Sequence, residues 1–210
     1  MKTVLCYGDS LTFGTNPEGG RHDYENRWPT VLGKGLDDTL IIAEGLGGRT
    51  TVFDDFSAVA DRNGAKLLPA MLASHSPLDC VVVMLGTNDL KPFICGDALG
   101  AAMGVKRLIE IIRTYPYAED NGIPKIVLVA PPFAVKTENL MMAAMFGGRI
   151  EESHLFVKYY TAIAEEMDCD FFNAASVAAA SPLDGVHLDA ENTRAIGEAL
   201  VPVVNEVLES

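Results

Sequence analysis

Residues 4–11 read VLCYGDSL, an apolar strand pattern that ends at a glycine and is followed at once by Asp9 and Ser10. A doubly wound α/β protein binds its ligands outside the carboxyl ends of its parallel strands. Ser10 therefore stands where such a protein places reactive groups, although a serine at this kind of junction more often caps a helix. The stretch predicts a first strand, a turn and a candidate nucleophile.

The sequence DGVH at residues 184–187 brings a carboxylate and an imidazole into one short segment. A serine hydroxyl needs a neighbouring base to become a nucleophile, and an imidazole can accept the proton and later return it. His187 is the candidate base, and Asp184 can orient the imidazole and stabilise its charged form. Ser10, Asp184 and His187 are thus predicted to form a triad. The G-x-S-x-G motif of α/β-hydrolases is absent around Ser10, so that fold is disfavoured.

Two further strand patterns end in segments that could complete such a site. Residues 78–85, LDCVVVML, form an apolar run typical of a strand buried on both faces, and GTND follows it. Residues 40–43, LIIA, lead into EGLGGRT, whose paired glycines let a backbone N–H approach a ligand. The N–H groups of Ser10 and Gly48 and the side chain of Asn88 are therefore candidate oxyanion donors, each contributing about 2.7–4 kcal/mol to barrier lowering.

These features also have plain structural explanations. The Asp-Gly pair at 184–185 is a common turn, and Asn-Asp at 88–89 suits an Asx turn after a strand. Asp9 is expected to hold its turn through local hydrogen bonds, and Arg49 and Arg62 are expected to be surface ion-pair residues. The joint occurrence of the motifs, in this order and at predicted strand ends, favours the catalytic interpretation.

Alternating strand and helix patterns predict one α/β domain over residues 1–210, with a five-stranded parallel sheet between two layers of helices. The segment 131–148 is long for a connection and includes the apolar sequence LMMAAMF, which suggests a lid, a core helix or a subunit contact. The strands are expected near 2–7, 39–43, 79–85, 125–130 and 169–172, and the helices near 27–37, 64–75, 97–114, 149–167 and 190–208.

Composition and charge exclude several classes of partner. The 210 residues, 49% of them hydrophobic, can bury an ordinary core, and the net charge of −13 argues against nucleic acid and favours an uncharged ester as substrate. No apolar run reaches the roughly 18 residues of a membrane span, and the chain does not start with a leader pattern. The cysteines and histidines lack metal-binding spacings, so we expect a cytoplasmic protein with reduced thiols, no metal and no cofactor.

Four blocks of the chain resemble, in order, the four blocks of the GDSL or SGNH hydrolase family. Within it the chain is similar to bacterial arylesterases and related acyltransferases. The resemblance implies a flavodoxin-like α/β/α sandwich and an acyl-enzyme on Ser10 that hydrolyses short-chain acyl or aryl esters. It also implies pocket walls at Phe13 and Phe93 and a homo-oligomer, with an octamer as one candidate assembly. The blocks are GDSL at 8–11, GGRT at 47–50, GTND at 86–89 and DGVH at 184–187.

Two positions depart from the family pattern. Phe13 stands where close relatives often have Trp, and Gly48 stands where members noted for acyl transfer have Ala. Hydrolysis is therefore expected in preference to acyl transfer to an alcohol or to hydrogen peroxide.

Three alternatives remain at this point. A carbohydrate acetylesterase would carry the same four blocks. A flavodoxin-like module would use residues 10–15 to bind the phosphate of FMN, but this interpretation assigns no function to Asn88, Asp184 or His187. A magnesium-dependent phosphoryl enzyme would use Asp9 as nucleophile, but it lacks the second acidic residue expected where Leu11 stands.

Overall fold

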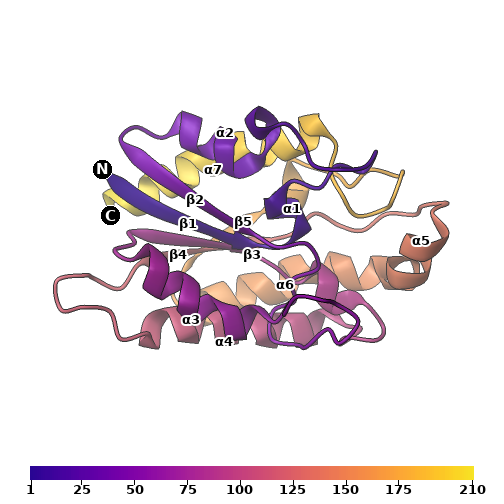
Figure 1. Cartoon of the computed structure of the whole chain (residues 1–210), viewed down its shortest axis with the longest axis horizontal. Helices are drawn as coiled ribbons and strands as arrows, with labels where there is room; N and C mark the ends of the chain where they lie inside the picture. Colours follow the sequence, from indigo (N-terminus) through magenta and orange to yellow (C-terminus); the bar gives the residue numbers. More distant parts are fainter.

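The computed structural model describes all 210 residues and has at its centre a parallel sheet of five strands in the order β2-β1-β3-β4-β5. Helices cover both faces of this sheet, α2 and α7 on one face and α3, α4 and α6 on the other (Figure 1). The predicted fold class is therefore confirmed, and every strand begins within one residue of its expected start. The strands are β1 (Lys2–Gly8), β2 (Thr39–Gly45), β3 (Cys80–Met84), β4 (Lys125–Ala130) and β5 (Asp170–Asn173).

The α-helices follow the predicted alternation and add two short elements near the sheet edge. Those two are α1, directly after β1, and α5, which lies inside the long 131–148 connection. The α-helices are α1 (Ser10–Phe13), α2 (Trp28–Gly35), α3 (Gly64–His75), α4 (Ala98–Thr114), α5 (Leu140–Phe146), α6 (Ile150–Glu166) and α7 (Ala190–Glu209). Short 3₁₀ helices are η1 (Tyr24–Asn26), η2 (Thr87–Leu90), η3 (Gly147–Arg149) and η4 (Ala174–Ser176).

The central strands are apolar throughout because both of their faces are buried. Along β1, Leu5 and Tyr7 join the core beneath α3, α4 and α6, whereas Val4 and Cys6 join the core beneath α2 and α7. Successive side chains of a strand point to opposite faces, so an uninterrupted apolar run supplies both cores at once. None of the helices combines the length and the apolar character that a membrane span requires.

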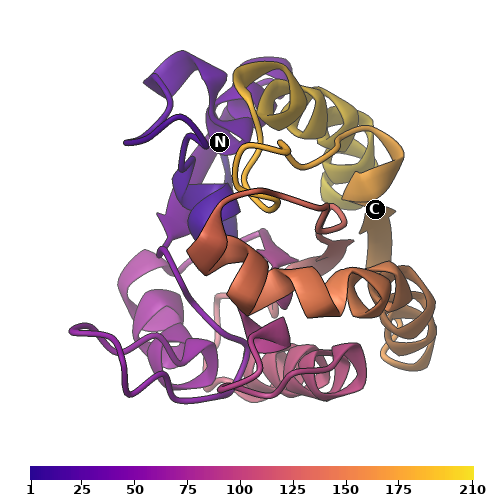
Figure 2. The ribbon, with the colours of Figure 1, turned by 90° about the vertical axis from the view of Figure 1, so that its right-hand side faces the viewer.

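The order of the strands places the ends of β1 and β3 side by side. Gly8 at the end of β1 pairs with Met84 at the end of β3, while the chain between them leaves β1 on its other side to form β2. Ligands of open α/β sheets bind in the crevice at such a switch point. Figure 2 looks onto this edge, where α5 lies across the front of the sheet, and Figure 1 shows both chain termini at the opposite edge.

Candidate active site

Ser10 is held at the end of β1 by a tight turn. The Asp9 carboxylate caps α1 by accepting a hydrogen bond from the Leu11 N–H at 2.9 Å, which leaves Ser10 as the first helical residue. Gly8 is required because a Cβ atom there would lie 2.0 Å from the Thr12 hydroxyl and 2.8 Å from the Met84 carbonyl. The turn therefore brings the start of α1 against the neighbouring strand and places Ser10 on the wall of a cavity at the sheet edge.

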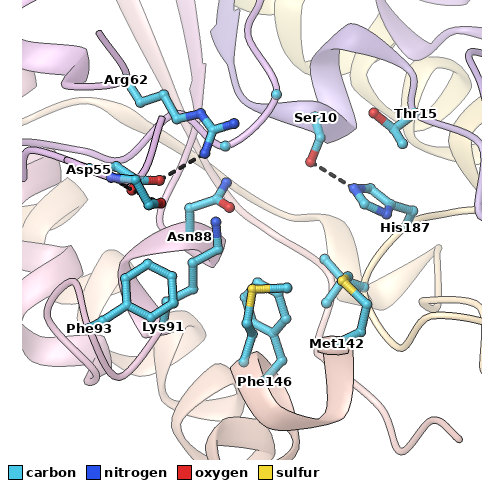
Figure 3. Close-up of a pocket in the computed structure, with 15 residues that line it drawn as sticks. Ser10, Thr15, Asp55, Arg62, Asn88, Lys91, Phe93, Met142, Phe146 and His187 are labelled. Carbon is cyan, nitrogen blue, oxygen red and sulfur yellow. Dashed lines mark hydrogen bonds and ion pairs between the residues drawn. The ribbon is translucent and has the colours of Figure 1, made fainter. Parts of the chain in front are cut away.

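The hydroxyl of Ser10 meets the ring of His187, which lies 177 residues later in the chain. The distance from Ser10 Oγ to His187 Nε2 is 2.9 Å, and His187 Nδ1 lies 2.6 Å from Asp184 Oδ2 (Figure 3). The structure thus brings together the three residues that the sequence predicts as a triad, in the relay order that nucleophilic catalysis requires.

The loop that carries Asp184 and His187 is closed by its own backbone. The Ser181 N–H donates to the His187 carbonyl at 2.8 Å, and the Gly185 N–H donates to the Ser181 carbonyl at 2.8 Å. Gly185 has φ = +83°, a left-handed conformation that favours glycine. Asp189 then caps α7, as expected from the sequence, by accepting from the Asn192 N–H. The loop is fixed at both ends, so the imidazole is held in place before any ligand arrives.

Asp184 is poised to remain a carboxylate. Burial alone would raise the pKa of Asp184, but the hydrogen bonds from the His187 ring and from the N–H groups of Val186 and His187 outweigh that effect and lower it. An ionised Asp184 accepts a hydrogen bond from Nδ1–H, which keeps the ring proton on Nδ1 and leaves Nε2 free to accept the Ser10 proton.

Two backbone donors near Ser10 are unused by the protein. The N–H groups of Ser10 and Gly48 have no hydrogen-bond acceptor in the chain. The Asn88 amide nitrogen lies 3.3 Å from Asp9 Oδ2 and 3.2 Å from the Arg49 carbonyl, both long for hydrogen bonds. The Asn88 side chain is placed beside the cavity by η2, directly after β3. These three groups are the candidate oxyanion donors.

Arg49 corrects the expectation of a surface ion pair. Its side chain is 3% exposed, its guanidinium lies 4.1 Å from the centre of the Tyr7 ring, and it donates to the carbonyls of Gly8 and Glu44. It therefore joins the ends of β1 and β2 beneath the active-site loops. A buried arginine that donates to carbonyl groups shows no sequence signal that distinguishes it from a surface arginine.

Two buried carboxyl groups lie behind the site. Burial raises the pKa of Asp9 to about 6 and that of Asp89 to about 7, against partly compensating hydrogen bonds. Asp89 accepts from the backbone N–H and hydroxyl of Thr51, and Asp9 accepts from Leu11 and Asn88. Because Asp9 is 1% exposed, it cannot present an oxygen to a phosphoryl group, which disfavours the magnesium-dependent alternative.

A cavity of about 360 Å³ opens beside Ser10 and has two chemically different walls. Phe93 and the side chains of α5 form the apolar wall, and the charged side chains of Asp55, Arg62 and Lys91 form the polar wall (Figure 3). The 131–148 segment thus contributes a partial lid, since Met142, Met145 and Phe146 from it face the cavity.

Only one of the two residues predicted to form pocket walls lines the cavity. Phe93 lines the cavity, but Phe13 does not, because its ring packs under the Arg21 guanidinium at 3.9 Å. The structure thus gives Phe93, but not Phe13, a place on the wall of this cavity. Arg62 forms the ion pair expected of it, with Asp55 at 2.8 Å, and also lines the cavity. Asp55 and Lys91 were not predicted as site residues, since no periodicity or motif marks a polar pocket wall built from loops.

Replacing Gly48 with alanine is expected to destabilise the fold. Gly48 has φ = +82°, and a Cβ atom there would lie 2.6 Å from Arg62 Cζ. Left-handed backbone costs an L-residue about 1–2 kcal/mol, so urea unfolding should show a loss of that size. Gly47→Ala is the matched control because nothing lies within 4 Å of its added Cβ. Equal stabilities for the two variants would contradict this account.

A serine, an imidazole and a carboxylate linked by hydrogen bonds at the switch point of a parallel sheet define a serine hydrolase. The chain belongs to the GDSL-like lipase/acylhydrolase family, which matches residues 6–194. It is a carboxylic ester hydrolase, as the resemblance of its four blocks indicates. The observed strand order is shared with flavodoxin-like proteins, so family membership rather than topology disfavours the FMN-binding alternative.

Solved structures agree with this assignment. A carbohydrate acetylesterase family member from Sinorhizobium meliloti is 51% identical, with a TM-score of 0.98 over 100% of both chains. A candidate arylesterase from Agrobacterium tumefaciens is 47% identical, with a TM-score of 0.93 over 99% of this chain and 100% of that one. The native aryl esterase of M. smegmatis is 35% identical, with the same score and coverage. No curated protein is similar enough to the chain to count as a match.

Proposed function

We propose that this protein is a cofactor-independent serine esterase that hydrolyses short-chain acyl or aryl esters through an acyl-enzyme on Ser10. The observation that carries the proposal is the line of contacts from Ser10 Oγ to His187 Nε2 at 2.9 Å and from His187 Nδ1 to Asp184 Oδ2 at 2.6 Å. The aryl esterase and acetylesterase structures support the choice of small esters.

Acylation begins when Ser10 Oγ attacks the ester carbonyl carbon and His187 Nε2 takes the hydroxyl proton. The bond from Oγ to carbon forms as the carbonyl π bond breaks, and the resulting oxyanion is held by the N–H groups of Ser10 and Gly48 and by Asn88. When the intermediate collapses, His187 gives its proton to the departing alcohol or phenol oxygen. Asp184 stabilises the imidazolium between these two transfers.

Deacylation repeats these steps with water in place of Ser10. His187 removes a proton from the water, whose oxygen attacks the acyl carbon, and the proton returns to Ser10 Oγ as the carboxylic acid leaves. An alcohol in place of water would give acyl transfer. We propose hydrolysis as the main outcome, because Gly48 stands where transferring relatives have alanine.

Replacing Asn88 with alanine is expected to lower kcat by about 10²–10³-fold, because it removes one of three oxyanion donors. KM should change much less, since the lost hydrogen bond strengthens mainly in the transition state. Steady-state kinetics on p-nitrophenyl acetate measure both values. An unchanged kcat would remove Asn88 from the oxyanion site.

The proposed function is tested by p-nitrophenyl acetate hydrolysis with protein purified without added metal or cofactor. We expect turnover that chelator treatment does not reduce and that a serine-directed phosphonate abolishes with a 1:1 stoichiometry. No turnover, or turnover that survives the phosphonate, would contradict the proposal.

A carbohydrate acetylesterase is the second candidate function, favoured by the 51% identity to an acetylesterase family member and by the charged wall of the cavity. Charged side chains can donate and accept hydrogen bonds with sugar hydroxyl groups. Hydrolysis rates for acetylated saccharides against phenyl acetate distinguish the two. Self-association into a homo-oligomer and a cytoplasmic location remain predictions from the resemblance and the composition.

A further inference from the structure

Lys91 is a largely buried lysine that lines the active-site cavity. The residue is only 7% exposed, and its Nζ atom has no hydrogen-bond acceptor and no carboxylate within 4 Å. The aromatic group nearest to it is the Phe146 ring, whose centre lies 5.9 Å from Nζ. Buried charges in proteins are ordinarily paired, because transfer out of water without a partner is costly. The unpaired ammonium therefore points to a ligand that supplies the partner.

The carboxylates around Lys91 are already engaged elsewhere. Asp55 is the one acidic residue that lines the cavity, and it binds Arg62 Nη1 at 2.8 Å through Oδ2 and Ser57 through Oδ1. Asp9 and Asp89 lie behind the wall and are held by their own hydrogen bonds. On the cavity wall itself two cations thus face one carboxylate, and Asp9 and Asp89 behind the wall attract the Lys91 ammonium only at longer range.

The position of Lys91 relative to His187 indicates which part of an ester it meets. Lys91 Nζ lies beside Asn88, and both are across the cavity from His187 (Figure 3). The leaving group must lie beside His187, which protonates it, and the oxyanion must lie beside Asn88 and Gly48. The remaining substituent of the tetrahedral carbon is the acyl chain, which neither His187 nor the oxyanion donors hold. Lys91 is a cation on the cavity wall away from His187, so it is available to that substituent.

We propose that Lys91, with Arg62 beside it, binds a carboxylate at the far end of the acyl group, so that half-esters of short dicarboxylic acids are preferred substrates. This inference rests on the proposed function and names a substrate class for the same site. An acyl carboxylate would accept charge-assisted hydrogen bonds from the ammonium, whereas a neutral acyl chain would leave the ammonium unpaired. It also replaces the expectation of an uncharged substrate, because local charge governs a pocket more closely than net charge does.

The test compares monoethyl succinate with ethyl 4-methylpentanoate, whose branched end has the shape of the carboxylate without its charge. A pH-stat measures kcat/KM for both esters in the wild-type protein, Lys91→Met, Lys91→Arg and Lys158→Met. We expect the wild type to prefer the anionic ester, and Lys91→Met to lower the ratio of the two values by about 10–100-fold. Lys91→Arg should keep most of the preference, and Lys158→Met, on the outer part of α6, should keep all of it.

Three outcomes would overturn the inference while leaving the esterase assignment intact. The first is a wild-type protein that hydrolyses both esters equally well. The second is a preference that persists in Lys91→Met. The third comes from a parallel comparison of 4-acetoxybenzoate with phenyl acetate, in which the negative charge is on the leaving group. If the Lys91 substitutions changed only this second comparison, Lys91 would bind a carboxylate on the leaving group and not on the acyl group. If Lys91→Met fails to fold, Lys91→Gln takes its place. Failure to hydrolyse p-nitrophenyl acetate as well would instead contradict the proposed function.

Discussion

Ser10→Ala is expected to reduce kcat for p-nitrophenyl acetate by about 10⁴–10⁶-fold, because the substitution removes the atom that forms the acyl-enzyme. Residual turnover would come from the oxyanion donors and from binding alone. The far-UV circular dichroism and the melting temperature should stay close to those of the parent protein. The hydroxyl of Ser10 bonds only to His187, and the cap of α1 is supplied by Asp9.

Two controls make the Ser10 result specific. Ser176→Ala removes a hydroxyl in η4 that bonds only to the Asn173 carbonyl, and it should leave kcat unchanged. Mass spectrometry after rapid quenching should detect an added acetyl group in the parent protein and none in Ser10→Ala. Activity within tenfold of the parent in Ser10→Ala would contradict the assignment of the nucleophile.

Asp184→Asn is expected to lower kcat by about 10⁴-fold while leaving the loop in place. The amide oxygen can still accept from the N–H groups of Val186 and His187, as Oδ1 of Asp184 does at 3.0 and 2.9 Å. The amide NH₂ would then face His187 Nδ1 and donate to it. That hydrogen bond stabilises the tautomer with the proton on Nε2, which cannot accept the Ser10 proton.

The control for Asp184→Asn is Asp189→Asn, five residues later. Asp189 also accepts from a backbone N–H, as the cap of α7, and asparagine caps helices about as well as aspartate. Its kcat should match that of the parent protein. A small loss for Asp184→Asn, or an equal loss for both variants, would show that Asp184 acts only as a structural residue of its loop.

The catalytic residues and the residues that form the remaining cavity walls lie on different elements of the fold. Ser10 and Asn88 follow two adjacent strands, so the sheet itself sets their separation. The other walls of the cavity instead come from α5 and from the loops that hold Asp55, Arg62 and Lys91. Loops and short helices can change without disturbing the parallel sheet, which lets one catalytic arrangement serve different esters.

Much of this architecture could be predicted from the sequence because it depends on local patterns. The unbroken apolar runs of β1, β3 and β4 follow from burial on both faces, and glycines such as Gly8 mark close approaches of the backbone. The chemistry of Ser10, Asp184 and His187 could also be anticipated, since few residue types serve as nucleophile, base and orienting acid.

The proximity of these three residues, and the side chains around them, could be known only from the tertiary structure. A contact between residues 177 positions apart exists because the strand order brings both segments to one sheet edge. No local sequence pattern indicates that Arg21 packs over the Phe13 ring or that Arg49 is buried. The same is true of Lys91, whose ammonium group has no ion-pair partner. Side-chain direction and burial at these positions are set by neighbours that are distant in sequence, so residue type and spacing carry no information about them.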